Sequence, residues 1–211
     1  MRNILPFLPG IEAIEAGALD NLSPEEIEDL RPDKGEEVLV SRLRDGSQVI
    51  LGRRKIVPLL LSALGRVVSA GAEAAVLLCT DVMELPPGPI PLIQPGKLLR
   101  AIVPSLISEG GSVGILVPLK EQVERARAIW TQVLSSYGLR RAEVKVGFFS
   151  PYSKGKIDIE PLKNCDIVVM DCMGYGLEHR SLLRRRLGGK VPILLASRIL
   201  ARVLSELWSP A

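Results

Sequence analysis

The sequence predicts an α/β fold in which helices cover both faces of a mainly parallel sheet. From residue 74 onward, short apolar runs alternate with longer segments whose apolar residues recur at helical spacing. The runs are continuous rather than alternating with polar residues, which is typical of strands buried on both sides. The predicted strands are residues 74–78, 113–117, 143–148, 167–171 and 191–195.

Ahead of this region the sequence predicts a short helix and an antiparallel hairpin. Ser23 supplies a capping hydroxyl, Pro24 suits the first helical position, and Glu26 completes a capping box. The segments 37–42 and 48–52 flank the pair Asp45-Gly46, which tolerates the positive φ angles of a tight turn. We therefore expect a small antiparallel hairpin near residues 37–52.

Helices are expected between the strands. Residues 54–70 carry apolar side chains at helical spacing, and Gly71 closes that segment. The prolines at 86, 87, 89, 91 and 95 instead predict an irregular loop, because proline donates no backbone N–H. The remaining predicted helices are residues 96–108, 119–137, 178–187 and 197–208.

Length and composition predict a single globular domain over residues 1–211. The chain is 47% hydrophobic and 24% charged, the usual globular proportions, which favour neither a disordered nor a fibrous class. Its net charge of +3, from 27 basic and 24 acidic residues, is too small and too mixed for a nucleic-acid footprint. No apolar run reaches the roughly 18–20 residues of a membrane span. Neither nucleic acid nor a membrane is therefore expected as a partner.

The cysteine and histidine content argues against disulfides and metals. Cys79, Cys165 and Cys172 are odd in number and far apart, and no secretion signal accompanies them, so a reducing cytoplasm is the expected location. His179 is the single histidine and no Cys-x-x-Cys pair occurs, so we expect no metal. No dinucleotide or Walker signature is present either, so the sequence predicts no cofactor.

Two cysteines stand where ligands of parallel sheets bind. Cys79 and Cys172 each follow a predicted strand, and ligands sit beyond the carboxyl ends of such strands. Backbone N–H groups can lower a thiol pKa from its usual value near ~8.5, which would make one cysteine a base and the other an acid. The alternative for either residue alone is a small buried hydrophobe, which is also our interpretation of Cys165.

His179 opens the helix that follows the Cys172 loop. In that position it could orient the loop or bind a carboxylate. It could equally be a helix-start residue that only satisfies local backbone groups. Both interpretations stay open.

Several motifs, taken together, resemble the AroM family. They are LSPEE at residues 22–26, SRLRDG at 41–46, GRRK at 52–55 and DCMGY at 171–175, with EAGALD at 15–20 and SRILAR at 197–202. The resemblance runs from about residue 12 to 208. The family name reflects gene proximity to shikimate-pathway enzymes rather than a reaction. The resemblance therefore implies a small carboxylate or an aromatic-pathway metabolite as partner, and fixes no activity.

More distantly, the chain resembles the aspartate/glutamate and hydantoin racemase superfamily. In that superfamily two pseudo-symmetric α/β halves each offer a cysteine for cofactor-independent proton transfer. The resemblance implies this architecture here, with Cys79 and Cys172 as catalytic residues. It also implies substrate-binding roles for Thr80, Met173 and Gly174, beside the His179 candidate.

The sequence departs from the AroM pattern in two places. AroM-like chains usually begin with a strand and a Thr-Ile-Gly-type turn, whereas here Met1 is followed almost at once by Ile4-Leu5-Pro6-Phe7. We therefore expect the usual N-terminal strand to be missing. Residues 161–164 are likewise too short for the full helix expected before the Cys172 strand.

Two functions are consistent with these patterns. The leading hypothesis is a racemase- or isomerase-type enzyme that moves a proton on a small carboxylate with two cysteines and no cofactor. The alternative is a non-catalytic protein that binds a small carboxylate linked to aromatic amino-acid metabolism. A homo-oligomer is compatible with either.

Overall fold

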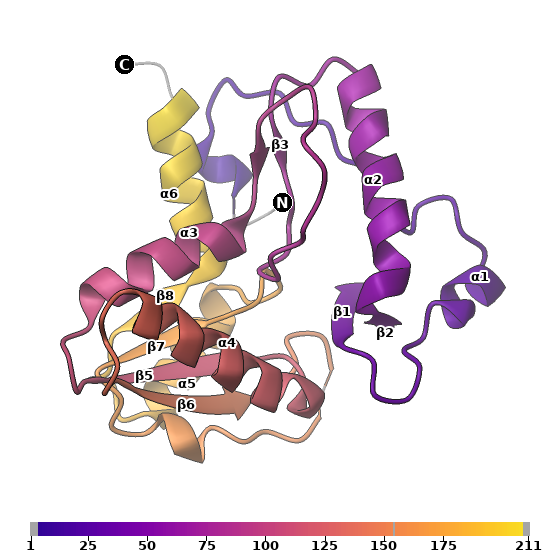
Figure 1. Ribbon diagram of the computed structural model, residues 1–211. Helices are drawn as coiled ribbons and strands as arrows, with labels where there is room; N and C mark the ends of the chain where they lie inside the picture. Colours follow the sequence, from indigo (N-terminus) through magenta and orange to yellow (C-terminus); the bar gives the residue numbers. More distant parts are fainter. Residues whose placement is uncertain (1–3, 154, 209–211) are drawn as a thin grey trace. The chain divides into compact units, whose positions relative to one another are not determined.

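The computed structural model describes residues 4–153 and 155–208, which form two compact units (Figure 1). The described residues within 1–11, 78–82 and 94–211 form the sheet unit. Residues 12–77 and 83–93 form the hairpin unit. The single domain expected from sequence stays a prediction.

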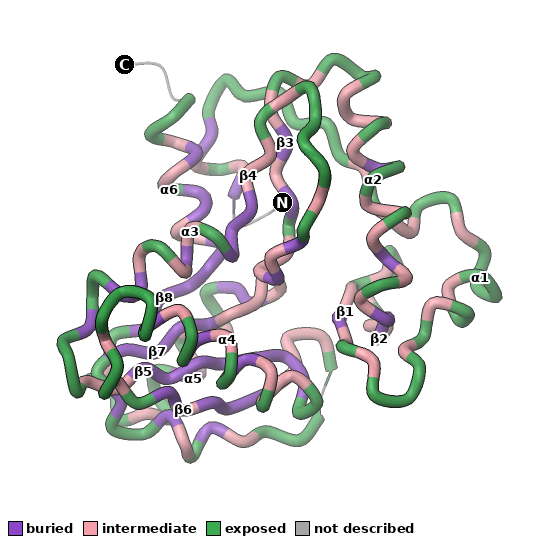
Figure 2. Tube along the Cα trace, viewed as in Figure 1, coloured by how far each residue is buried: buried purple, intermediate pink, exposed green. Residues whose placement is uncertain are grey.

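A four-stranded parallel sheet with strand order β6-β5-β7-β8 is the centre of the sheet unit. Its strands are β5 (Ser112–Val117), β6 (Glu143–Phe148), β7 (Ile167–Met170) and β8 (Ile193–Leu195). In Figure 2 these strands are mostly buried, as their apolar sequences predict.

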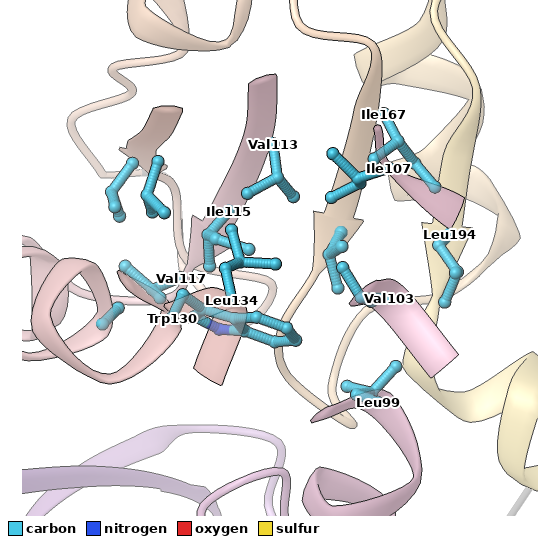
Figure 3. Packing of buried hydrophobic residues seen from close by; sticks show 14 of the residues in the cluster. Leu99, Val103, Ile107, Val113, Ile115, Val117, Trp130, Leu134, Ile167 and Leu194 are labelled. Carbon is cyan, nitrogen blue, oxygen red and sulfur yellow. The ribbon is translucent and has the colours of Figure 1, made fainter. Parts of the chain in front are cut away.

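Successive residues of the central strand β5 pack on opposite faces of this sheet. On one face, Ile115 and Val117 join a cluster that includes Leu99 of α3 (Pro95–Ile102) and Trp130 of α4 (Val123–Ser136), as Figure 3 shows. On the other face, Leu116 packs in a cluster with Leu183 of α5 (Leu177–Arg186). Helices therefore cover both faces.

The sheet unit is completed by α6 and four 3-10 turns. They are α6 (Ala196–Trp208), η1 (Leu5–Phe7), η2 (Val103–Leu106), η3 (Lys120–Gln122) and η4 (Glu160–Leu162). Residues 4–11 contain η1 and no strand, as the sequence led us to expect. The segment before β7 is likewise a short 3-10 turn instead of a full helix.

The hairpin unit contains α1 (Pro24–Asp29), β1 (Val38–Arg42), β2 (Gln48–Gly52) and α2 (Arg53–Ser69). Strands β1 and β2 are antiparallel, with Val40 opposite Ile50. The predicted capping box is present, because the Glu26 N–H donates to Ser23 Oγ (3.2 Å) and the Ser23 N–H to Glu26 Oε2 (2.7 Å). The predicted helix and hairpin are both confirmed.

The strand before Cys79 differs from the sequence prediction. Only Ala75–Val76 form a strand, β3, which pairs in parallel with β4 (Leu92–Ile93) in the hairpin unit and not with the four-stranded sheet. Strand β4 lies in the proline-rich stretch predicted to be irregular. Proline has no backbone N–H, but its carbonyl can still accept a hydrogen bond, and the Ala75 N–H donates to Pro91 O (2.8 Å).

The predicted fold class, a parallel sheet with helices on both faces and a small antiparallel hairpin, is confirmed. Among the residues described, no helix combines the length and the apolar character that crossing a membrane requires.

Candidate active site

Cys172 lies in a turn, residues 171–175, that begins directly after β7. The Asp171 N–H extends the sheet pairing by donating to Leu116 O (2.9 Å). At the other end of the turn, the buried Tyr175 hydroxyl donates to Phe149 O (2.7 Å), and Ser197 Oγ donates to Tyr175 O (3.3 Å). The turn is therefore anchored at both ends, which fixes the direction of the Cys172 side chain.

Cys79 lies in the short segment 78–82, which belongs to the sheet unit with Cys172. The Thr80 hydroxyl donates to Asp171 O (3.1 Å). On the other side of Thr80, the Asp81 carboxylate forms a 2.9 Å ion pair with Arg125 of α4. The first contact joins the Cys79 segment to the Cys172 turn, and the second joins it to α4.

Both thiols are protonated at neutral pH. Burial is the main cause that raises the pKa of Cys79 to about 11 and that of Cys172 to about 12. Charge on Asp171 raises both values further, and charge on Cys79 raises the pKa of Cys172. The two sulfurs are thus near enough for one thiolate to disfavour the other.

The hydrogen-bond donors around the two sulfurs lower the thiol pKa values. The Gly174 N–H donates to Cys172 Sγ (3.4 Å), and the Tyr152 hydroxyl also bonds this thiol. The Asp81 N–H bonds the Cys79 thiol. From the sequence we expected backbone N–H groups at the start of a following helix to lower a thiol pKa. The backbone donors belong instead to the loops after the cysteines, and desolvation outweighs them, so both pKa values are raised.

Asp171 adds a largely enclosed carboxyl group beside the thiols. Burial raises its pKa, whereas the Trp130 indole, the Thr80 hydroxyl and the Arg100 charge lower it. Trp130 Nε1 donates to Asp171 Oδ2 (2.8 Å). The site therefore combines two thiols with a carboxylate whose negative charge opposes thiolate formation.

The predicted substrate-binding residues have identifiable positions. Thr80 is half-buried, with its hydroxyl engaged by Asp171, and Gly174 gives its N–H to Cys172. Met173 packs against the core cluster around Trp130. Their substrate roles stay predictions.

His179 has a defined local partner. Its Nδ1 accepts the Gly176 N–H (2.9 Å) at the start of α5, and its ring lies against Phe149 and Tyr175, each at 5.9 Å between centroids. His179 Nδ1 therefore satisfies a local backbone group at the helix start, while a role of His179 in binding stays a prediction.

His179 also lines an open pocket of about 420 Å³ beside the Cys172 turn. The other lining residues are Phe149, Ser150, Pro151, Tyr152, Ser153, Gly155, Ile157 and Leu182. Tyr152 is common to the pocket and to the surroundings of the Cys172 thiol. A ligand in this pocket would therefore contact a residue that touches the sulfur.

Cys165, in contrast, is a core residue. Its side chain is buried, and its sulfur lies 3.9 Å from Pro161 O. This agrees with its interpretation as a small buried hydrophobe. In the described part of the chain, no three His, Cys, Asp or Glu residues are grouped so as to hold a metal ion.

Comparison with known proteins identifies the family. The family model described as AroM protein matches residues 1–208. The chain belongs to the AroM family. No curated protein matches this AroM chain in sequence.

Solved structures of two glutamate racemases share the fold of the AroM chain. RacE1 from Bacillus anthracis is 13% identical with a TM-score of 0.54, and the match covers 73% of this chain and 64% of that enzyme. The enzyme from Aquifex pyrophilus is 14% identical with a TM-score of 0.52, and the match covers 74% of this chain and 67% of that enzyme. The chain thus matches less than two thirds of the Bacillus enzyme. At this identity the likeness shows the fold alone.

Sequence reasoning missed several residues of the AroM site. Asp81 and Asp171 could have been found, because an aspartate lies within two residues of each candidate cysteine. Trp130 and Arg125 offer no such signal, since they come from a helix distant in sequence. Tyr152 lies in a polar loop and carries no signal at all.

Proposed function

We propose that this AroM protein is a cofactor-independent racemase- or isomerase-type enzyme. In the proposed reaction, Cys79 and Cys172 exchange protons with opposite faces of a carbon beside a carboxylate. The main support is that two free cysteines from distant parts of the chain meet in one unit, with the Thr80–Asp171 hydrogen bond between their segments. Both side chains remain partly accessible to a ligand.

The proposed step balances without an oxidant or a cofactor. One cysteine, as thiolate, removes the proton from the carbon, and the electron pair delocalises into the adjacent carboxylate. The other cysteine, as thiol, gives its proton to the opposite face of that carbon. One S–H bond forms as the other breaks, so the two cysteines end with exchanged protonation states.

The raised pKa values restrict the substrate. A thiol with a pKa of about 11 is ionised in only about one molecule in 10⁴ at pH 7. Because Asp81 and Asp171 are already near the thiols, a substrate with only negative groups would make the thiolate still rarer. We therefore favour a small carboxylate that also carries a cationic group near the reacting carbon. Both thiols have to stay reduced, which suits the cytoplasmic location expected from sequence.

Deuterium incorporation tests this function. The protein is incubated in D₂O with the separate enantiomers of small amino and 2-hydroxy carboxylic acids, and exchange at the α carbon is followed by mass spectrometry. We expect deuterium exchange into at least one amino acid. In both Cys79→Ser and Cys172→Ser, the conversion of one enantiomer into the other should be lost. Cys165→Ala is the matched control and should keep full activity.

Exchange that is unchanged in both serine variants would overturn the two-thiol mechanism. Melting curves of all three variants separate a loss of chemistry from a loss of folding.

The raised pKa values also favour a second candidate, a non-catalytic protein that binds a small carboxylate. Protonated thiols are weak nucleophiles, as expected of cysteines that only pack. Slow alkylation of the free protein therefore fits both functions and cannot separate them. Under this second function, a carboxylate would raise the melting temperature without any exchange at its α carbon.

A further inference from the structure

Tyr152 lies in the loop between β6 and β7, and local hydrogen bonds hold its backbone. The base of the loop is closed by two reciprocal bonds between Phe148 and Asp158, at 2.8 and 2.9 Å. Within the loop, the Tyr152 N–H donates to Ser150 Oγ (3.1 Å). The Phe149 N–H donates to Val117 O (3.1 Å), which ties the start of the loop to the sheet edge.

The Tyr152 side chain reaches the Cys172 turn over a glycine. A Cβ at Gly174 would overlap the Tyr152 hydroxyl oxygen and the adjoining ring carbon. Gly174 has no positive φ, so the missing side chain serves this close approach and not an unusual backbone conformation. From there the hydroxyl bonds the Cys172 thiol, while the Gly174 N–H reaches the same sulfur.

We infer that Tyr152 is a positioning residue whose hydroxyl, together with the Gly174 N–H, stabilises the thiolate of Cys172. The inference deepens the proposed function, since that function requires this thiolate. Its hydrogen bond is nevertheless tested without any substrate. The phenol keeps its own proton and donates it, so no covalent step is involved.

Two converging donors suit a sulfur that becomes negative. Donors aimed at a developing charge act strongly in an enclosed site, where water does not compete. Charged sulfur gains more from each donor than neutral sulfur does, so the bonds selectively favour the ionised form. Tyr152 thereby opposes the desolvation that keeps Cys172 protonated.

The test measures how fast Cys172 reacts with iodoacetamide between about pH 7 and 9, with peptide fragmentation assigning the label to Cys172. The variants are Tyr152→Phe, which removes only the hydroxyl, and Gly174→Ala, which displaces it while keeping the N–H. Tyr137→Phe, at a side chain that is 57% exposed, is the matched control.

Both test variants should raise the pKa of Cys172. If loss of the donor raises the pKa of Cys172 by about one unit, the thiolate becomes about tenfold rarer. Alkylation should slow by only about three- to fourfold, because the thiolate of a less acidic thiol is a better nucleophile. The double variant should be no slower than the slower single variant, since both act through one hydroxyl. Tyr137→Phe should react like the original protein.

An unchanged rate in Tyr152→Phe with an unchanged melting temperature would overturn the inference. Additive slowing in the double variant would also overturn it, because Gly174→Ala would then act by another route. A slowed rate without any substrate exchange would support the role of Tyr152 and count against the proposed function.

Discussion

At the scale of single residues, the side chain of Asp171 accepts a hydrogen bond whose strength depends on whether the carboxyl group is charged. Its carboxylate accepts the Trp130 indole N–H at 2.8 Å, in surroundings that raise its pKa above the usual value. A hydrogen bond to a buried charged group contributes more than one between neutral groups. The contribution of Trp130 to folding should therefore depend on pH.

We predict that Trp130→Phe lowers the free energy of unfolding by about 1–3 kcal/mol more near pH 7 than at acid pH. Because the pKa of Asp171 is raised in the folded state, the stability that this group contributes is complete below its unfolded value of 3.8. That contribution is lost as the pH rises through the folded value, and the variant, whose folded Asp171 pKa is higher still, should go on losing stability up to a higher pH.

Urea unfolding at several pH values checks this result. The packing loss from the smaller ring is the same at every pH. A deficit that did not vary with pH would therefore show that the indole N–H has no charged partner.

Single residues also show what sequence could predict about the site. Cys79 and Cys172 were singled out because they follow apolar runs, and local order along the chain fixes that position, whereas Thr80 and Gly174 came only from the racemase resemblance. Tyr152 could not be found, because its contact with Gly174 depends on the path of an irregular loop.

At the scale of elements, the start of α3 packs closely against the Cys79 segment. A Cβ at Gly96 would overlap the carbonyl oxygen of Thr80 and crowd the Val82 side chain. The helix can approach this backbone only because residue 96 has no side chain.

Gly96→Ala should therefore destabilise the protein by about 1–3 kcal/mol, the usual cost of overpacking. It should also reduce proton exchange by displacing Cys79. The matched control is Gly65→Ala in α2, where nothing lies within 4 Å of the new methyl group. That change should stabilise the protein by about 0.5–1 kcal/mol through helix propensity.

Thermal unfolding of the two alanine variants checks the contrast. Equal effects at Gly96 and Gly65 would mean that the close approach of α3 to Thr80 is absent.

Elements were predicted well where the sequence signal is local. The capping box at Ser23 and the strands of the sheet match the structure because each depends on neighbouring residues. Strand pairing was not predicted, since Ala75 finds its partner in a stretch that its prolines made look irregular. In the hairpin, Gly46 has a φ of +91° as expected, but Asp45 instead accepts the Ser47 N–H (2.9 Å).

At the scale of the whole molecule, the two thiols should make folding sensitive to alkali. Their pKa values, about 11 and about 12, lie above the ordinary value of 9.0 expected in the unfolded chain. The stability they contribute is complete below about pH 9 and is lost as the pH rises through the folded values.

We therefore predict that the doubly substituted Cys79→Ser, Cys172→Ser protein loses less stability than the original protein between about pH 9 and 11. Burial is the main cause of the raised pKa of Tyr175 in both proteins, and charge on Cys172 is a further cause, so the difference reports the thiols together with their effect on Tyr175. Urea midpoints measured across this range check the prediction. Parallel curves for the two proteins would show that neither thiol is shielded.

The central claim is that Cys79 and Cys172 act on opposite faces of one carbon. The most direct test converts a single enantiomer of an accepted substrate in D₂O and analyses both enantiomers early in the reaction. Two separate thiols predict deuterium in the product enantiomer while the remaining substrate keeps its hydrogen, because the proton removed and the deuteron added belong to different sulfurs. Deuterium appearing equally in both enantiomers would mean that one group serves both faces, and would contradict the account.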